Sequence, residues 1–337
     1  MSAADTLTLP AAPALPGLVF RRFRGQPDFA PMTAIIAASV EADKLERVQT
    51  PEELERAYSH LHHSDPATDM LMAEINGELV AYGRVEWDKL DSGERTYTHL
   101  GYVRPDWRRR GLGRALLRWH QQRLRAIAAS QPHDGPRFFE ARANDTEPAA
   151  EALLLSEGYQ AIRHFFYMVR PTLEDLPDLP LPAGLEVRPV LPEHYQPVFA
   201  ALNEAFRDHW GYTPIAPEQV AAIMDSAQFQ PEHWQIAWDT AANEVAGLVI
   251  GTINAPENEK YQRQRGYTDP IGVRRPWRKL GLARALIAAS LRELRAQGMT
   301  EAALTVDTEN PSGALRLYEG LGYRPVKRGS IYRRPLD

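Results

Sequence analysis

One sequence pattern occurs twice in this chain, at residues 97–116 and 267–286, and the two copies align without a gap. Each copy predicts a short strand, a basic loop and a helix start. Chance similarity rarely keeps a turn, a charge and a helix start together over such a length. The repeat therefore predicts a tandem duplication, with two domains of one fold. The aligned identities include Tyr97 with Tyr267, Val103 with Val273, Trp107 with Trp277, Arg108 with Arg278, and Gly111 with Gly281.

The second copy combines the features of an anion-binding site. A strand is expected to end near Val273 and a helix to begin at Gly281, because apolar residues recur at i, i+3, i+4 and i+7 from Leu282. Free backbone N–H groups and the positive end of the helix dipole meet at such a helix start. Arg278 and Lys279 add full charges, and Gly281 allows a ligand to approach the backbone closely. A phosphate-bearing ligand is therefore expected here.

Both copies satisfy the short motif Gln/Arg-x-x-Gly-x-Gly/Ala, as Arg108-x-x-Gly111-x-Gly113 and as Arg278-x-x-Gly281-x-Ala283. The motif resembles the pyrophosphate-binding motif of the GNAT N-acetyltransferase superfamily. A dinucleotide-binding loop is disfavoured because neither copy has its third glycine. A P-loop is disfavoured because no Gly-Lys-Ser/Thr follows.

This resemblance implies binding of acetyl-CoA (coenzyme A) as co-substrate in both halves. Its pantetheine arm would pair like an added strand beside the motif strand, and the amides of Gly272 and Val273 would polarise the thioester carbonyl. In the second half the implied coenzyme residues are Ile271, Gly272, Val273, Arg278, Lys279, Leu280, Gly281, Leu282, Ala283 and Asn310. In the first half they are Tyr102, Val103, Arg108, Arg109, Arg110, Gly111, Leu112 and Gly113.

The stretch from Asn310 to Tyr323 resembles the other GNAT signature, in which an Asn leads a helix that carries a Tyr. The resemblance implies that Tyr318 lies beside the coenzyme A sulfur. A phenol, with a pKa near 10, can protonate a leaving thiolate, whose pKa is near 8.5. Packing of Tyr318 in the core is the alternative. The first half has Leu154 at the matching position and Asn144 out of register, so its catalytic part is in doubt.

A general base must take a proton from the incoming ammonium. Asp269 stands where many GNAT members carry a carboxylate that acts through water, and His99 is its counterpart in the first half. The alternative is that Asp269 only hydrogen-bonds the loop before Pro270. His209, in the Asp-His-Trp-Gly stretch that ends at Gly211, is a second candidate base.

The chain of 337 residues suits two domains of ordinary size. The expected division is a flexible tail at 1–17, a non-catalytic GNAT-like domain at 18–170, a proline-rich linker at 171–184 and a catalytic GNAT-like domain at 185–337. The fold class expected is α/β (α+β), each domain a mixed, mostly antiparallel sheet flanked by helices. Expected strands include 70–75, 79–87, 138–143, 161–170, 245–253, 302–306 and 323–333; expected helices include 30–42, 51–61, 111–129, 148–157, 217–227 and 311–320. Asn76-Gly77 predicts a hairpin between the first two of these strands, and Thr50 is the expected N-cap of the helix that begins at Pro51.

Composition excludes several classes of protein. A net charge of −5 argues against a general nucleic-acid binder. Cysteine is absent, so disulfides, thiolate metal sites and an acyl-cysteine intermediate are excluded. No apolar run reaches about 18 residues, so no membrane association is expected. Residues 1–17 lack the features of a signal peptide, and a cytoplasmic location is therefore expected. His60, His62 and His63 near Asp65 are interpreted as a solvated loop, and no metal is expected.

The sequence thus predicts an N-acetyltransferase that moves an acetyl group from acetyl-CoA directly to a primary amine. Tyr318, Asp269 and His209 are the catalytic candidates. The tandem layout with a fuller second half is also similar to that of mycothiol synthases. A small-molecule amine is favoured over a protein as acceptor, and a monomer or homodimer is expected. The alternative is a non-catalytic acetyl-CoA binding or sensing protein.

Overall fold

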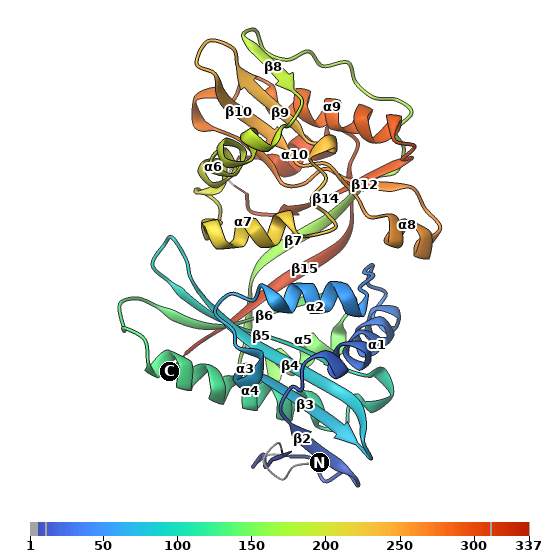
Figure 1. Ribbon diagram of the computed structural model, residues 1–337, viewed down its shortest axis with the longest axis vertical. Coiled ribbons are helices and arrows are strands. Elements are labelled where there is room, and N and C mark those ends of the chain that lie inside the picture. Colours follow the sequence, from blue (N-terminus) through green and yellow to red (C-terminus); the bar gives the residue numbers. More distant parts are fainter. Residues whose placement is uncertain (1–5, 11, 311, 337) are drawn as a thin grey trace. The chain divides into compact units, whose positions relative to one another are not determined.

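The computed structural model describes residues 6–10, 12–310 and 312–336, in two compact units. The first unit runs to Ile162 and takes in the C-terminal segment from Ser330; the second runs from Arg163 to Gly329. Figure 1 shows that each unit consists of strands flanked by helices. The predicted α/β fold class is confirmed. No helix in the described ranges has both the length and the apolar character needed to cross a membrane.

The elements from the N-terminus to the end of the first half are β1 (Thr6–Leu7), β2 (Leu18–Arg21), α1 (Gln26–Ala42), α2 (Pro51–Ser59), α3 (Pro66–Asp69), β3 (Met70–Ile75), β4 (Glu78–Lys89), β5 (Arg95–Val103), α4 (Leu112–Ala129), β6 (Arg137–Asn144), α5 (Pro148–Ser156) and β7 (Gln160–Arg170). Those of the second half are β8 (Leu185–Arg188), α6 (Tyr195–Phe206), α7 (Pro217–Met224), β9 (Gln235–Asp239), β10 (Glu244–Val249), β11 (Thr252–Ile253), α8 (Ala255–Tyr261), β12 (Arg265–Tyr267), β13 (Ile271–Val273), α9 (Leu282–Ala296), β14 (Glu301–Asp307), α10 (Ala314–Glu319) and β15 (Arg324–Pro335).

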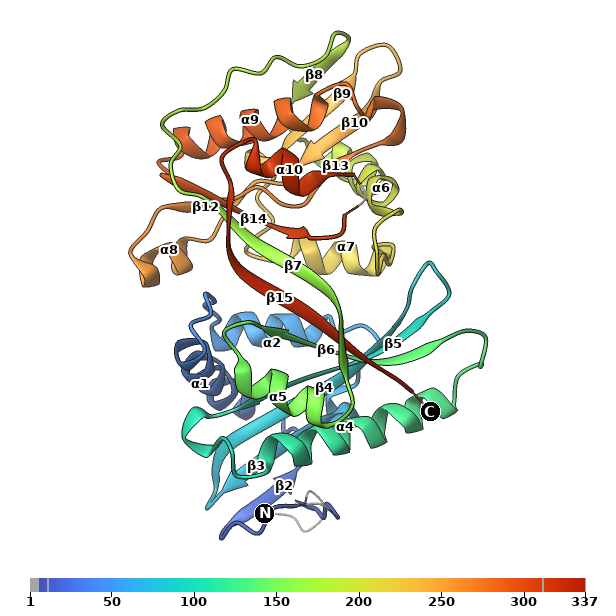
Figure 2. The ribbon, with the colours of Figure 1, turned by 180° about the vertical axis from the view of Figure 1, so that it is seen from behind.

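The sheet of the first unit has the strand order β1-β2-β3-β4-β5-β6-β15, with β5 and β6 parallel and the pairs from β1 to β5 antiparallel. Strand β3 is buried on both faces. Met70 and Met72 pack with α1 and α2, whereas Leu71 and Ala73 pack with the start of α4. Successive side chains of a strand point to opposite faces of the sheet. The continuous apolar run of β3 therefore packs against helices on both faces. Figure 2 shows α4 and α5 on the face opposite α1.

Local signals fix two features of this unit as predicted. Asn76 and Gly77 have φ values of 51° and 86°, and they join β3 to β4 in the tight turn that an Asn-Gly pair favours. Thr50 caps α2: its hydroxyl accepts the Glu53 N–H at 3.2 Å, and the Glu53 carboxylate accepts the Thr50 N–H at 3.0 Å.

The second unit holds strands in the order β7-β14-β12-β11 and a further sheet in the order β13-β10-β9-β8. Ile236 and Trp238 of β9 pack in the cluster that includes α6, whereas Ala237 and Ala246 pack in the cluster that includes α9. The same alternation as in the first unit therefore covers both faces of the sheet with helices.

The compact units differ from the predicted domain boundaries at 170 and 185. The part of β7 from Arg163 belongs to the second unit, where β7 pairs with β14 and Met168 joins the core. The part of β15 from Ser330 belongs to the first unit, where Tyr332 joins the core. The two halves thus exchange the ends of their final strands. Apolar periodicity predicts a strand but carries no information about its partner.

Four further features differ from the sequence-based expectations. The single strand expected to end at Val273 is two strands, β12 and β13, and the strand expected at 245–253 is β10 and β11. Helix α8 has no counterpart among the predicted helices. The expected flexible tail contains β1, which pairs with β2, although residues 1–5 and 11 lie outside the described residues.

Candidate active site

The candidate site lies where the strands of the second unit separate. Strand β12 pairs in parallel with β14, and the Thr268 N–H continues this contact by donating to the Ala303 carbonyl at 3.0 Å. After Pro270, β13 pairs instead with β10 as the edge strand of the other sheet. The free edge of β13 can therefore pair with an extended ligand, as expected for a pantetheine arm.

The ladder between β13 and β10 decides which amides face this free edge. The Arg274 N–H donates to the Ala246 carbonyl and the Ile250 N–H to the Pro270 carbonyl, each at 3.0 Å. Antiparallel alternation then directs the Gly272 N–H toward β10 and the N–H groups of Ile271 and Val273 toward the free edge. The prediction that the Gly272 amide polarises a carbonyl is therefore wrong.

Gly272 has a packing role instead. A Cβ atom at this position would lie 3.0 Å from Ala205 Cβ and 3.4 Å from the Phe206 ring. Glycine therefore lets α6 approach β13 closely.

The loop before α9 has the backbone shape of an anion cradle. Lys279 and Gly281 both take left-handed conformations, with φ of 64° and 85°. Gly281 caps α9, and the first-turn N–H groups beyond it have no intrahelical acceptor. Leu282 anchors the helix in the core, whereas Leu280 is exposed. A Cβ atom built on Gly281 would meet nothing within 4 Å, so the cradle of the second unit is open.

The motif arginine does not point into this cradle. The Arg278 guanidinium donates to the carbonyls of Val273 at 3.0 Å and Ala205 at 3.1 Å, and to the Asp208 carboxylate at 3.1 Å. Arg275 also pairs with Asp208, and these two guanidinium groups hold the pKa of that carboxyl at about 2. Arg278 is therefore a positioning residue that ties the loop to α6, which corrects the expectation that its charge faces the phosphates.

The first unit repeats this clamp. Arg108 donates to the Val103 carbonyl at 3.0 Å and to both oxygens of Asp43 at 2.6 and 2.8 Å. Sequence reasoning missed the pairing of the motif arginines with Asp43 and Asp208. Asp43 directly follows α1, and Asp208 lies two residues after α6. No short motif links either aspartate to the arginine loop.

The other predicted coenzyme residues of the first unit occupy the corresponding positions. Tyr102 precedes Val103, the last residue of β5, and accepts a hydrogen bond from Arg47 at 3.0 Å. Arg109 is left-handed, with φ of 63°, and the Arg110 guanidinium lies 4.6 Å from the Trp107 ring centroid. Gly111 caps α4, Leu112 is buried in the core, and Gly113 follows in the first turn.

Asp269 lies at the point of strand separation. Its Oδ2 atom accepts the Thr305 N–H of β14 at 3.1 Å, and burial raises the pKa of this carboxyl to about 6. A carboxylate with such a pKa is ionised at neutral pH and is a stronger base than a solvated one. The two roles weighed for Asp269 are thus compatible, because a carboxylate has lone pairs on two oxygen atoms and can support the backbone while it takes a proton.

Tyr318 is both a core residue and a candidate acid. It lies on α10, is 8% exposed and packs with Leu321 and Tyr323. Burial and the negative charge of Asp269 raise the pKa of Tyr318, so the phenol keeps its proton at neutral pH. The charge of Asp269 therefore acts on the Tyr318 phenol. Asn310 instead uses its side-chain oxygen to accept the Ser312 N–H at 2.9 Å before α10.

His209 lies on the connection between α6 and α7, with its ring 4.3 Å from that of Phe206. Burial lowers the pKa of His209, against the opposing charge of Asp307, so the imidazole is neutral at pH 7. The Arg163 guanidinium lies 5.5 Å from the Trp210 ring centroid and donates to Asp307 at 2.7 Å. Sequence reasoning missed Arg163 and Asp307 because their partnership joins distant parts of the chain.

At the positions that match Tyr318 and Asp269, the first unit carries an apolar side chain and an uncharged histidine. Leu154 is buried in the core. Burial lowers the pKa of His99 to about 4, and its Nε2 lies 3.0 Å from the Tyr159 hydroxyl, to which Gln121 also donates at 3.2 Å. The Tyr159 hydroxyl therefore shares a hydrogen bond with the neutral imidazole of His99.

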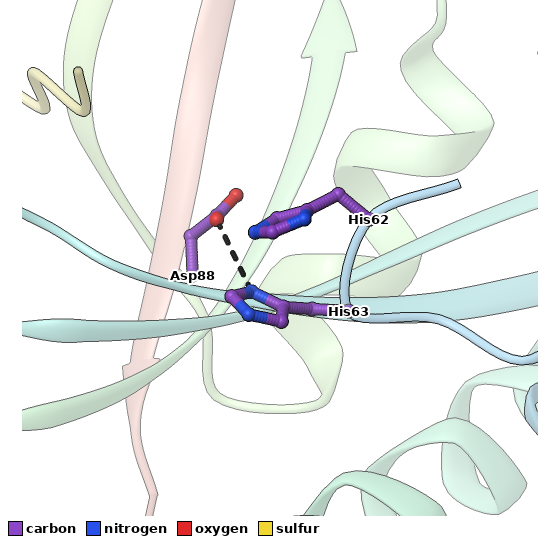
Figure 3. Close-up of side chains that lie close together, drawn as sticks. All are labelled: His62, His63 and Asp88. Atoms are coloured by element: carbon purple, nitrogen blue, oxygen red, sulfur yellow. Dashed lines mark ion pairs between the residues drawn. The ribbon is translucent and has the colours of Figure 1, made fainter. Parts of the chain in front are cut away.

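Among the described residues, His62, His63 and Asp88 are the one group that brings three potential metal ligands together (Figure 3). The His63 Nδ1 lies 3.1 Å from the Trp87 carbonyl and 3.6 Å from Asp88 Oδ1. Because a carbonyl oxygen only accepts, this Nδ1 carries its hydrogen and has no lone pair for a metal. The His63 ring also stacks on Trp87, with centroids 3.8 Å apart. The geometry fits an imidazole–carboxylate pair. Asp65 caps α3 instead.

Comparison with known proteins agrees with this geometry. The sequence profile of the acetyltransferase (GNAT) family matches residues 37–131 and 196–323. The mycothiol acetyltransferase of Thermobispora bispora is 30% identical over 307 residues, which cover 89% of this chain and 94% of that protein. The mycothiol acetyltransferase of Salinispora tropica is 31% identical over 302 residues, which cover 88% of this chain and 90% of that protein.

Two solved structures are similar over nearly the whole chain. A GCN5-related N-acetyltransferase from Sphaerobacter thermophilus has a TM-score of 0.73 at 26% identity, over 98% of this chain and 97% of that one. A tandem GNAT protein from the clavulanic acid biosynthesis pathway shares the fold, with a TM-score of 0.68 at 17% identity, over 95% of this chain and 99% of that one. The chain therefore belongs to the acetyltransferase (GNAT) family and is a tandem N-acetyltransferase, with a layout like that of mycothiol synthase.

Proposed function

We propose that the second unit transfers the acetyl group of acetyl-CoA to the primary amine of a small molecule. The curated relatives are named as mycothiol acetyltransferases, which favours a small-molecule acceptor over a protein. The observation that carries the proposal is the open cradle at Gly281 together with the free edge of β13, which Asp269 directly precedes in the loop before the strand. The first unit has a half-buried His99 and a buried Leu154 in the corresponding places, so we assign it no catalytic role.

The proposed reaction is a direct transfer. The amine nitrogen forms a bond to the thioester carbonyl carbon while the carbon–sulfur bond breaks. Asp269 takes the proton of the incoming ammonium through water, and the Val273 N–H stabilises the developing charge on the carbonyl oxygen. Tyr318 gives its proton to the departing thiolate, and the second proton that the amine nitrogen loses on becoming an amide restores the Tyr318 phenol. His209 is the alternative base, because its neutral imidazole can accept a proton without first losing one.

The acceptor is proposed to approach from the connection between α6 and α7. This connection carries His209 and Trp210, and the Arg163–Asp307 ion pair lies beside them. A neutral imidazole, an indole ring and a fixed ion pair suit a polar small molecule that carries its amine toward Asp269.

Release of free coenzyme A thiol, measured over a panel of small amines, tests this function. The chain has no cysteine, so every thiol detected comes from the coenzyme. Tyr318→Phe should lower turnover about 10²-fold, the low end for loss of a general acid, with acetyl-CoA affinity nearly unchanged.

Tyr323→Phe is the matched control, because it removes another buried hydroxyl, which lies 2.7 Å from the Thr268 hydroxyl in the same core. Wild-type turnover in Tyr318→Phe would remove that phenol from the mechanism. Coenzyme binding without thiol release for any amine would instead favour the acetyl-CoA binding or sensing protein.

A further inference from the structure

The N-terminal segment of the first unit is folded against the protein. We call residues 6–10 and 12–16 the N-terminal strap. Thr6 pairs with Arg21 and Leu7 with Phe20 in the β1–β2 ladder. Farther along the strap, the Leu15 N–H donates to the Pro13 carbonyl at 2.9 Å. These contacts give the strap a defined path beside the sheet.

The strap lies over the start of α4. Leu7, Leu9 and Leu15 are partly buried against the core cluster that contains Leu112, Ala115 and Leu116. Trp107, from the motif loop, packs against the same cluster. The strap therefore covers the elements that form the predicted coenzyme cradle of the first unit.

Pro13 occupies the space that the cradle glycine leaves open. A Cβ atom on Gly111 would lie 3.0 Å from Pro13 Cβ and 3.5 Å from Pro13 Cγ, whereas a Cβ atom on Gly281 would meet nothing within 4 Å. The two glycines otherwise match, with φ and ψ of 91° and −14° for Gly111 and 85° and −2° for Gly281. The two cradles thus share a backbone shape and differ in what lies against it.

We propose that the cradle at Gly111 is a docking site for the N-terminal strap and that it does not take a coenzyme pyrophosphate while the strap is docked. A proline ring is apolar and has no N–H, so it fills the space beside the glycine without replacing an anion's hydrogen bonds. The chain then binds one acetyl-CoA, in the second unit. This inference rests on the proposed function of that unit, and it replaces the prediction of two coenzyme sites.

Calorimetric titration of the full chain with coenzyme A tests the proposal. The wild type should bind one coenzyme per chain, and Gly281→Glu should bind none. Leu9→Ser/Leu15→Ser, made in the Gly281→Glu chain, removes the apolar anchors of the strap and should restore binding of one coenzyme, at the first cradle. Pro10→Ser/Ala14→Ser changes two exposed strap positions and is the matched control, which should leave the Gly281→Glu chain without binding.

The number of coenzymes bound by each variant distinguishes the strap proposal from the coenzyme site proposed in the second unit. Two coenzymes bound by the wild type would overturn the proposal, as would no binding by the strap-released chain with an unchanged thermal melt. One coenzyme retained by Gly281→Glu would instead count against the coenzyme site proposed in the second unit. Deletion of residues 2–16 gives a second way to open the cradle if the double serine variant fails to fold.

Discussion

Replacing Asp269 by asparagine should remove most of the acetyl transfer and make the second unit more stable at neutral pH. The structure places this carboxylate in a half-buried position, where it accepts a backbone hydrogen bond from Thr305, and desolvation raises its pKa to about 6. The difference from the usual value near 4 corresponds to about 3 kcal/mol between the two protonation states. The side chain keeps some contact with solvent, so we expect about half of this in stability.

The sign follows from proton binding. A carboxyl group whose pKa is raised by folding holds its proton better in the native state, so stability is fully present below pH about 4 and is lost as the pH rises through about 6. An asparagine side chain stays neutral at every pH, and its carbonyl oxygen can still accept the Thr305 N–H. The Asp269→Asn variant should therefore match the wild type near pH 4 and melt several degrees higher above pH 7, at about 2–4 °C per kcal/mol for a domain of this size.

Thermal melts from pH 4 to pH 8 and thiol release over the same range measure both effects. Wild-type kcat/KM should rise through pH about 6, and Asp269→Asn should lose about 10²-fold or more. Asp239→Asn is a control that should lower, and not raise, the melting temperature at neutral pH. Amides of the turn at 241–242 and the Trp277 indole lower the pKa of that carboxyl, so its charged form stabilises the fold. A melting difference for Asp269→Asn that does not grow with pH would refute the burial argument, and retained activity would transfer the role of base to His209.

Other variants separate binding from positioning. Gly281→Glu should abolish donor binding and activity, because a side chain and a negative charge would fill the open cradle; calorimetry that still shows a filled second-unit site would contradict this. Asp208→Asn removes the charged partner of Arg278 and should raise the KM for acetyl-CoA severalfold with kcat nearly unchanged, whereas an equal fall in kcat would place Asp208 in the chemistry. Thr50→Ala removes the cap of α2 and should lower stability by about 1 kcal/mol with unchanged turnover, as followed by denaturant melts.

Local chemistry in the sequence predicted much of the fold and part of the site. The Asn76–Gly77 turn, the Thr50 cap and the helix starts at Gly111 and Gly281 all depend on neighbours in the chain, and all lie where expected. The stretch from Asn254 to Glu257 carries the same kind of signal for α8, since the Asn254 side chain accepts the Glu257 N–H at 3.1 Å. Helix α8 was therefore within reach of sequence reasoning, although it was missed.

Non-local contacts decided the remainder. The sequence by itself determined a duplicated strand–loop–helix motif, with Asp269 in its second copy, and a separate helix that carries Tyr318, because these are properties of short segments. Only the tertiary structure decided that β7 and β15 share their residues between units, that Arg278 points to Asp208, and that Pro13 lies beside Gly111. The raised pKa of Asp269 also belongs to the fold, because desolvation depends on every element packed around the carboxyl, including elements far from it in sequence.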